Sequence, residues 1–345
     1  MKGLRLLCLD NDIVVYFRHL SFYIGDVNHC VATLSVPFYL RVLSRFRLFV
    51  RLLRLEPRCA EFIGERYLIF CILHKVWMLD IERGKIQCIF EARDGFSDPL
   101  NLCKVGNCVY WGDYGNNVNR EEVNIYRVDS SAKIEVVYRF PCGSVRHVHN
   151  LIFDTKNQNF WIFTGDNDKL AGIYSADKDF FKVEAINIGD QRYRAVVGFP
   201  FNGGVIYATD SVEKDNYLFI STSDTGFQPR MLAELNGSCI YGTETAAYYV
   251  FSTTVESPEG RGLFSLLSNK LGRGIKSRDV HLIAVKKQNI SDIKIIGKFR
   301  KDWLPMKLFQ YGAVLFPSGQ QKNKDLWIYP VACRKTDGKL FKIRL

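Results

Sequence analysis

The chain has 345 residues and a formal net charge of +11, from 47 Lys and Arg against 36 Asp and Glu. Because 47% of its residues are apolar, burial of side chains can offset the entropy lost on folding, which excludes a disordered, collagen-like or low-complexity protein. The basic excess is compatible with an anionic partner but identifies none. The aromatic content of 14% favours strands over helices.

Residues 1–36 contain four short apolar runs, at 4–9, 13–17, 20–24 and 30–36, which predict a small sheet of four strands. Asp10, Asp12 and Arg18 interrupt the apolar stretch that a signal peptide would need. No window of the chain reaches the ~18 uncharged apolar residues of a transmembrane helix. We therefore expect a soluble, cytoplasmic protein.

Residues 37–58 predict a basic amphipathic helix that ends at Pro57. Arginines recur at helical spacing and share one face, namely Arg47, Arg51, Arg54 and Arg58. Apolar side chains occupy another face, namely Leu43, Phe46, Val50 and Leu53. Two interpretations stay open: a helix that packs against the rest of the fold, or a surface for acidic membrane lipid or a protein partner.

From residue 59 onward the chain repeats a unit of an apolar strand, a tight turn and a second strand rich in aromatics, followed by a small residue and an acid or hydroxyl. The clearest copies end at Asp113, Asp166 and Asp210, which are 53 and 44 residues apart. Each copy is followed by two further strands. Four strands in about 40–50 residues are typical of one blade of a β-propeller.

The repeats predict an all-β protein, a six- or seven-bladed β-propeller with one inserted basic helix near the N-terminus. Residues 1–36 would form a short first blade, 37–58 the helix, and 59–345 the remaining blades of a single propeller domain. The predicted blades are 59–91, 100–139, 147–187, 193–235, 238–299 and 305–343. A basic, Gly- and Ser-rich insertion at 257–279 interrupts the sixth of these and predicts a loop.

Two histidines at the start of one inner strand are the leading candidates for chemistry. His147 and His149 are two residues apart, so their side chains share one face of a strand, and Asp166 and Asp168 end the neighbouring strand. Such a group could relay a proton, bind sugar hydroxyls or hold a divalent metal, and the alternative is a structural hydrogen-bond network. We predict catalytic roles for His147, His149, Asp166 and Asp210, with no cofactor, and leave open a metal at His147, His149 and Asp166.

Other polar residues are expected at the same end of the propeller, because the first strand of a blade begins where the second one ends. Arg192 and Arg194 would share a face and present planar forks to an anion, or else pair with acids in a buried ring. The predicted substrate-binding residues are Arg192, Tyr193, Arg194, Asp113, Glu256, Lys307 and Gln310. This composition suits an anionic or polyhydroxylated glycan.

Common enzyme motifs are missing from the sequence. It contains no GxSxG nucleophile elbow, no Walker A loop and no HExxH pair. Its basic residues are spread along the chain apart from 41–58 and 261–278, so we expect no nucleic-acid partner.

The repeated hairpins that end in a small residue and Asp resemble those of the sialidase-like, or Asp-box (BNR-repeat), propellers. The strings at 146–150, 164–166, 193–196 and 306–310 look like a poorly characterised branch of that family, found in bacteria that build surface polysaccharides. The resemblance covers about residues 57–345. It implies the propeller fold but not sialidase activity, because the Tyr/Glu nucleophile pair and a third clamp arginine have no match here.

These observations lead to two hypotheses about function. In the first, the chain is a carbohydrate-active or carbohydrate-binding propeller for an anionic glycan or glycan precursor, as in capsule or exopolysaccharide metabolism. If it is an enzyme, we expect a glycoside hydrolase or a polysaccharide lyase, with a histidine as general acid or base and the arginines on the anion. In the second, it is a non-enzymatic scaffold that docks to a membrane-associated or protein assembly through residues 37–58.

Overall fold

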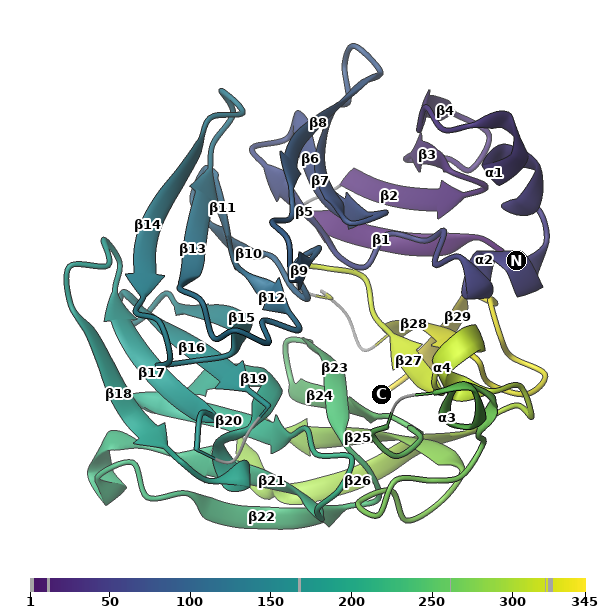
Figure 1. Ribbon diagram of the computed structural model, residues 1–345. Coiled ribbons are helices and arrows are strands. Elements are labelled where there is room, and N and C mark those ends of the chain that lie inside the picture. Colours follow the sequence, from purple (N-terminus) through teal and green to yellow (C-terminus); the bar gives the residue numbers. More distant parts are fainter. Residues whose placement is uncertain (1–2, 11–12, 167–168, 261, 320, 322–324) are drawn as a thin grey trace. The chain divides into compact units, whose positions relative to one another are not determined.

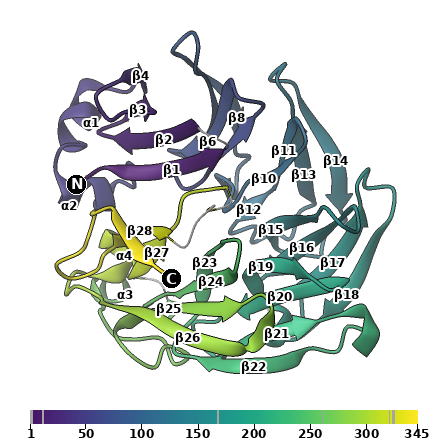
Figure 2. The ribbon, with the colours of Figure 1, turned by 180° about the vertical axis from the view of Figure 1, so that it is seen from behind.

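The computed structural model describes residues 3–10, 13–166, 169–260, 262–319, 321 and 325–345. Asp168, and Arg261 of the basic insertion, therefore lie outside the described residues. The fold is all-β, with about 8% helix, and its seven blades are arranged as a β-propeller. The prediction of six or seven blades is thus confirmed, with seven as the number. The chain divides into two compact units, which are described in turn (Figures 1 and 2).

The first unit comprises residues 1–56, 210–218 and 231–345. Its N-terminal blade is a four-stranded sheet in chain order, β1 (Arg5–Asp10), β2 (Ile13–Arg18), β3 (Ser21–Ile24) and β4 (Cys30–Thr33). A second blade contains β23 (Cys239–Glu244), β24 (Tyr248–Thr253), β25 (Asp279–Lys286) and β26 (Asn289–Arg300). The last blade has three strands, β27 (Ala313–Leu315), β28 (Asp325–Val331) and β29 (Phe341–Arg344).

Four short helices also belong to this unit: α1 (Phe38–Leu43), α2 (Arg47–Leu52), α3 (Leu263–Leu267) and α4 (Met306–Phe309). None of the helices in the described ranges is both long and apolar enough to cross a bilayer. Helix α3 lies in the basic insertion predicted as a loop at 257–279.

The second unit comprises residues 57–209 and 219–230. One of its blades contains β5 (Ala60–Ile63), β6 (Tyr67–Ile72), β7 (Lys75–Asp80) and β8 (Lys85–Glu91). The next contains β10 (Cys103–Val105), β11 (Cys108–Gly112), β13 (Val123–Val128) and β14 (Ile134–Phe140), with a small separate sheet of β9 (Phe96–Ser97) and β12 (Tyr114–Gly115). A third contains β15 (His147–Asp154), β16 (Asn159–Gly165), β17 (Gly172–Asp177) and β18 (Val183–Ile188).

The remaining blade is divided between the two units. It contains β19 (Ala195–Phe201), β20 (Gly204–Thr209), β21 (Asn216–Ser221) and β22 (Arg230–Leu235). Two 3₁₀ turns flank its strands, η1 (Gln191–Tyr193) and η2 (Ser223–Thr225).

The second strand of each blade carries most of the large buried rings. Of the ten aromatic residues among the largest fully buried side chains, eight lie on second strands: Phe17, Phe70, Trp111, Phe160, Phe163, Tyr207, Phe251 and Tyr329. A strand inside a sheet, covered by the neighbouring blades on both faces, reads as a continuous apolar run. Many of the aromatic residues in the sequence therefore serve to pack neighbouring blades against each other.

The basic helix predicted over 37–58 is present in two pieces, α1 and α2, separated by residues 44–46. Phe46 is extended, with φ −108° and ψ 115°. The buried Ser44 sits at the break, where its hydroxyl donates to the carbonyl of Arg41 at 2.7 Å and its own carbonyl accepts from His19 at 2.9 Å. These local bonds take the place of the helical bonds that would join the two halves.

Two arginines of this segment are largely buried, which is the reverse of an ordinary packing helix. Arg51 is buried, with 3% of its side chain exposed, and Arg47 is largely buried. Arg47 makes a paired contact with Asp337 at 2.9 and 3.0 Å and binds Glu56 at 2.8 Å. Arg51 binds Asp302 at 2.5 Å. Three carboxylates within the first unit thus draw Arg47 and Arg51 inward, and Phe46, Leu48 and Leu52 are exposed, although Val50 stays buried.

Candidate functional site

The histidine pair lies at the beginning of β15, within the second unit. His147 pairs with Gly165 of β16 and Val148 pairs with Thr164, but the register then shifts so that Asn150 faces Phe163. His149 is therefore the extra residue of a β-bulge, a device that re-aims a side chain. A register shift also occurs near the beginning of the first strand in three other blades, namely β1, β19 and β23.

Gly165 leaves the space that the His149 ring occupies. A Cβ atom at this position would overlap the imidazole and lie 2.6 Å from its Nε2 atom. Gly165 is the small residue that precedes Asp in the repeat of the sequence. It must be small here because His149 of the neighbouring strand β15 fills the space beside it.

Both imidazoles form a hydrogen bond from Nδ1 to a backbone carbonyl oxygen. His147 Nδ1 lies 2.5 Å from the carbonyl oxygen of Gly115, and His149 Nδ1 lies 2.8 Å from that of Ala195. Because a carbonyl oxygen only accepts, both Nδ1 atoms carry the ring proton. The two Nε2 atoms point at the same carboxylate, at 3.5 Å from Asp166 for His147 and 3.2 Å for His149.

Burial sets the charge of this group. Burial lowers the pKa of His149 below its ordinary value, although the neighbouring Asp166 opposes this. Burial alone would raise the pKa of Asp166, but the contacts from His147 and His149 and the charge of Arg194 hold that pKa well below its usual range. The group therefore contains an ionised carboxylate facing a neutral His149, whose Nε2 atom presents a lone pair.

Two arginines complete the surroundings of Asp166. Arg194 NH2 lies 3.1 Å from Oδ1 and Arg146 NH1 lies 3.4 Å from Oδ2. Arg194 also donates to the Asp166 carbonyl at 3.2 Å. The histidines are almost completely buried, whereas 23% of the Asp166 side chain is exposed, so the carboxylate is the part of the group open to solvent.

Tyr114 packs against His147, and Arg58 packs against Tyr114. The ring of Tyr114 lies 4.8 Å from that of His147, and the two imidazoles are also 4.8 Å apart. The guanidinium of Arg58 covers Tyr114 at 5.5 Å. This stack fixes the plane of His147.

Arg146 and Arg58 are the contributors that the sequence did not select. Arg146 directly precedes the histidine pair, so its position in the chain could have identified it. Arg58 carried no such signal, because its spacing assigned it to the basic helix.

The paired arrangement predicted for Arg192 and Arg194 is wrong. Residues 191–193 form the 3₁₀ turn η1, which Asp190 caps by accepting from the Arg192 amide at 2.8 Å, and β19 begins only at Ala195. The period of two therefore does not apply. Arg194 is buried beside Asp166, whereas Arg192 is exposed, pairs with Asp190 at 3.3 Å and covers the ring of Tyr193.

Asp113, predicted to bind substrate, is a buried carboxylate with three protein partners. It accepts from Arg93 at 2.5 Å, from the Asn124 amide at 2.9 Å and from the Tyr126 hydroxyl at 3.1 Å. Burial raises the pKa of Asp113, and these hydrogen bonds oppose the rise. This environment indicates a structural role.

Four predicted residues belong to the first unit. Asp210 is buried. Glu256 accepts hydrogen bonds from Ser238 and Thr254 at 2.6 and 2.5 Å. Lys307 donates to the Gly260 carbonyl and the Ser265 hydroxyl, and Gln310 follows α4 in a left-handed conformation with φ 65°. Their predicted convergence with the histidines stays a prediction.

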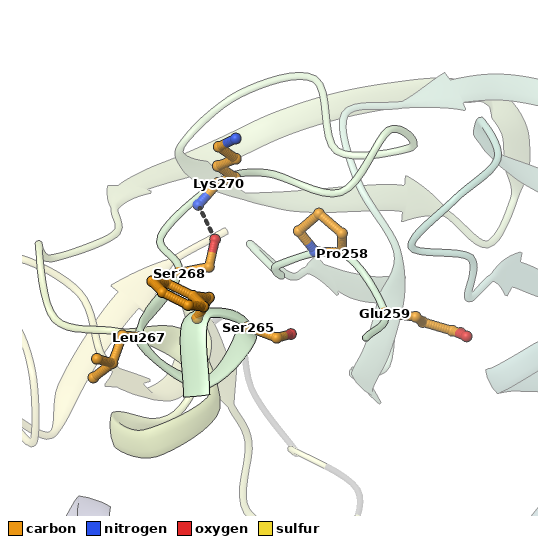
Figure 3. A pocket seen from close by; sticks show the side chains of 7 residues that line it. Pro258, Glu259, Ser265, Leu267, Ser268 and Lys270 are labelled. Carbon is orange, nitrogen blue, oxygen red and sulfur yellow. Dashed lines mark hydrogen bonds between the residues drawn. The ribbon is translucent and has the colours of Figure 1, made fainter. Parts of the chain in front are cut away.

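A pocket of about 510 Å³ lies beside α3 in the same unit (Figure 3). It contains none of the predicted site residues, and its lining comes from a single stretch of chain: Pro258, Glu259, Phe264, Ser265, Leu267, Ser268 and Lys270. Ser265 of this lining accepts from Lys307, whereas His147, His149 and Asp166 belong to the other unit.

His147, His149 and Asp166 could hold a metal ion. One ligand atom from each residue lies within 4.8 Å of the others. The donor chemistry fits a divalent first-row metal, because two imidazoles with Nδ1 bonded to backbone carbonyls and one carboxylate form a common ligand set. The expectation of no cofactor is therefore not confirmed, and the metal that the sequence left open at these three residues fits their arrangement.

Comparisons with known proteins agree on the fold. No protein-family model and no curated protein matches the sequence. Among solved structures, an oligogalacturonate lyase in complex with manganese is 7% identical over 99% of this chain and 88% of its own, with a TM-score of 0.58. An oligogalacturonate lyase from Vibrio parahaemolyticus is 8% identical over 91% of this chain and 85% of its own, with a TM-score of 0.53. A chain of the mitotic checkpoint complex is 8% identical over 99% and 90%, with a TM-score of 0.54.

At such low identity these similarities establish the β-propeller and nothing finer. The propeller part of the resemblance found in the sequence is confirmed, whereas these similarities do not show its sialidase-like family.

Proposed function

We propose that the chain binds an anionic, polyhydroxylated glycan or glycan precursor at a divalent-metal centre formed by His147, His149 and Asp166. One observation carries the proposal: both Nδ1 atoms donate to backbone carbonyls while both Nε2 atoms face one carboxylate. A similar fold in an oligogalacturonate lyase with manganese agrees with this chemistry.

The electrostatics of the cluster favour a cation between the rings and the carboxylate. A neutral imidazole whose proton is on Nδ1 presents a lone pair at Nε2, and a carboxylate oxygen presents another, so the two repel. A hydrogen bond between them would require a second ring proton, which burial of His149 disfavours. A divalent metal would satisfy both nitrogens and the carboxylate at once.

The charge around the site then requires an anion. Asp166 with Arg146 and Arg194 carries a net charge of +1, and a divalent ion would raise this to +3. A carboxylate of a uronic acid, or a phosphate of a glycan precursor, would offset this charge and could accept the planar fork of an arginine. Binding of the metal and binding of the anion should therefore strengthen each other.

The bound metal would act as a Lewis acid that polarises the anionic group of the sugar. Arg194 and Arg146 orient that group, and the buried rings exclude water from one side. Because a nitrogen that binds a metal cannot also carry a proton, this proposal removes the acid/base role predicted for His147 and His149.

Metal binding is tested first, by calorimetric titration of metal-depleted protein with Mn²⁺. We expect one equivalent to bind, and His147→Ala and His149→Ala to weaken binding by at least about tenfold to a hundredfold. His74→Ala is the matched control, because His74 also lies beside a carboxylate, Asp98, at 3.6 Å but has no second histidine. Unchanged binding in both site variants would overturn the metal centre.

Glycan binding and turnover are tested next, with an oligogalacturonate and Mn²⁺. Arg194→Ala should weaken binding, whereas Arg192→Ala should leave it unchanged, because Arg192 is exposed and paired with Asp190. Turnover by a lyase breaks the C4–O bond with loss of the C5 proton and leaves an unsaturated product that absorbs ultraviolet light. Turnover by a hydrolase adds water and gives a reducing end without that absorption.

The competing hypothesis is a scaffold without turnover. It is favoured by the four protein partners that Asp166 already has, because a closed ion-pair network can be purely structural. Failure to bind both Mn²⁺ and an anionic glycan would support it. A role in capsule or exopolysaccharide metabolism, membership of the sialidase-like branch and a cytoplasmic location remain predictions.

A further inference from the structure

Exposed apolar side chains are concentrated on the short helices of the first unit. Among the residues that the structure describes, 18 large apolar side chains are exposed. Twelve of them lie on α1, α2 and α3, in the turn after α1 or α2, or just before α4: Phe38, Tyr39, Val42, Phe46, Leu48, Leu52, Leu53, Leu263, Phe264, Leu266, Leu267 and Trp303. We call these twelve side chains the apolar helical surface.

The exposure on α1 and α2 results from the inward arginines. Because Arg47 and Arg51 point at the carboxylates of Asp302 and Asp337, the opposite face of the segment, with Phe46, Leu48 and Leu52, is turned to solvent. An ordinary packing helix would bury these residues and expose its charges.

The helices form one continuous region, because α4 contacts both α2 and α3. Both views of the ribbon show α4 between the two (Figures 1 and 2). Arg51 of α2 donates to the carbonyl of Phe309 in α4 at 2.7 Å, and Lys307 of α4 donates to Ser265 of α3 at 2.5 Å. The Asn269 amide after α3 holds the carbonyl of Trp303 at 2.7 Å.

The charged side chains along α1 and α2 have one sign, whereas α3 has both an acid, Glu259, and a base, Lys270, beside it. Residues 38–55 contain five arginines and no acid. Arg41, Arg45 and Arg54 are exposed, as is Lys270 after α3. Apolar and aromatic side chains flanked by exposed cations complement a partner that has an apolar interior covered by an anionic layer.

We propose that the apolar helical surface inserts into the headgroup region of an anionic lipid bilayer. Six-residue helices are only about 9 Å long, so such helices lie in the interface. Aromatic rings such as Phe264, which is 94% exposed, and Trp303, which is 80% exposed, favour that depth. The exposed arginines would then meet lipid phosphates and acidic headgroups.

A second copy of the chain fits this surface less well. Docking two copies face to face would bring two surfaces with exposed arginines together, and like charges across a contact oppose association. The proposal is independent of the metal centre, whose residues lie in the second unit.

The test is flotation of the purified chain with vesicles of neutral phosphatidylcholine, or with the same lipid containing phosphatidylglycerol. We expect binding only to the anionic vesicles and weaker binding at high salt. Phe46→Glu combined with Phe264→Glu should lower the partition coefficient by about tenfold or more, because two large side chains lose their apolar burial. Arg41→Gln combined with Arg45→Gln should lower it several-fold.

The matched control is Phe181→Glu, which changes an equally exposed ring on the second unit and should leave partitioning unchanged. All these positions are exposed, so thermal melting should be unaltered, and Mn²⁺ binding should persist in every variant. Absence of wild-type flotation, or equal loss in Phe181→Glu, would overturn the proposal. A dimer in light scattering that Phe46→Glu dissociates, without vesicle binding, would show self-association instead.

Discussion

At the scale of single residues, the candidate site depends on positions with no functional group of their own. Gly165 provides the volume for the His149 ring, and the carbonyls of Gly115 and Ala195 fix which nitrogen of each histidine faces Asp166. Orientation by backbone acceptors is typical of metal-binding histidines. The sequence showed which side chains could take part in chemistry, but it did not show in which direction they point.

Gly165→Ala tests this dependence. The added methyl group would displace the His149 imidazole, so we expect Mn²⁺ affinity to fall by about tenfold to a hundredfold while the fold is retained. Calorimetric titration measures the affinity, and circular dichroism checks the fold. Gly297→Ala is the control, because the nearest atom to its new methyl group is the end of the flexible Phe299 ring. Equal affinities in both variants would contradict the assigned role.

Much of the candidate site could be predicted residue by residue, and the failures have a local cause. His147, His149, Asp166 and Arg194 were selected from their positions at strand ends, and the structure places them together. Arg192 was misassigned because Asp190 caps a 3₁₀ turn where a strand was expected. The period of two predicts side-chain direction only within a strand, so it does not apply to Arg192, which lies in the turn before β19.

At the scale of elements, the segment from α1 to α2 shows that amphipathic spacing does not say which face is buried. The sequence shows an arginine stripe and an apolar stripe, and either can face the protein if it finds partners there. Glu56, Asp302 and Asp337 are those partners, and with Arg47, Arg51 and Lys301 they form a neutral cluster. Two of these acids lie about 250 residues or more from the helices, too far for any local pattern to reveal.

Asp337→Asn tests the contribution of this cluster to stability. Burial alone would raise the pKa of Asp337, but the hydrogen bonds and charge of Arg47 and the charge of Arg51 lower it below its ordinary value. Because the folded pKa lies below the unfolded pKa of about 3.9, the stabilisation is complete above that pH and is lost as the pH falls through the folded value.

We therefore expect Asp337→Asn to lower the free energy of unfolding by about 1–3 kcal/mol at pH 7. Urea unfolding followed by circular dichroism measures the loss at pH 7, 5 and 3. The difference from the wild type should persist at pH 5 and shrink at pH 3, because there Asp337 of the unfolded wild-type chain has taken up a proton that the folded state still excludes. A difference that is constant from pH 7 to 3 would contradict the linkage. Asp325→Asn, a more exposed acid that pairs with Lys342, is the control and should change stability little.

At the scale of the whole chain, the charge of +11 is distributed differently from what the sequence suggested. Residues 41–58 hold six of the arginines against one acid, but Arg47 and Arg51 are neutralised within the first unit. The remaining positive charge should still attract an anionic polymer over distances of about a Debye length.

The glycan binding proposed above should therefore depend steeply on salt. We expect the affinity to fall several-fold or more between about 50 and 500 mM NaCl, because screening removes the long-range attraction. Fluorescence anisotropy of a labelled oligogalacturonate measures this, and a neutral oligosaccharide of equal length is the control. An affinity that is independent of salt would mean that short-range contacts alone hold the glycan.

Local sequence was sufficient for the class of fold and for the number of strands in most blades. Alternating or continuous apolar residues mark each strand, and Gly, Asn and Asp mark the turns, so a propeller of six or seven blades could be predicted without long-range information. The structure decides the number, which is seven. The aromatic second strands follow from the same pattern, since their rings are needed wherever one blade packs on another.

Three features required the folded chain. They are the bulge and backbone carbonyls that aim His147 and His149 at Asp166, the 3₁₀ turn that separates Arg192 from Arg194, and the acids near the C-terminus that draw Arg47 and Arg51 inward. The turn depends on the local cap from Asp190, whereas the aim of the histidines and the burial of the arginines depend on contacts between residues far apart in the chain. Such contacts decide where a side chain points, whereas local pattern decides only which element carries it.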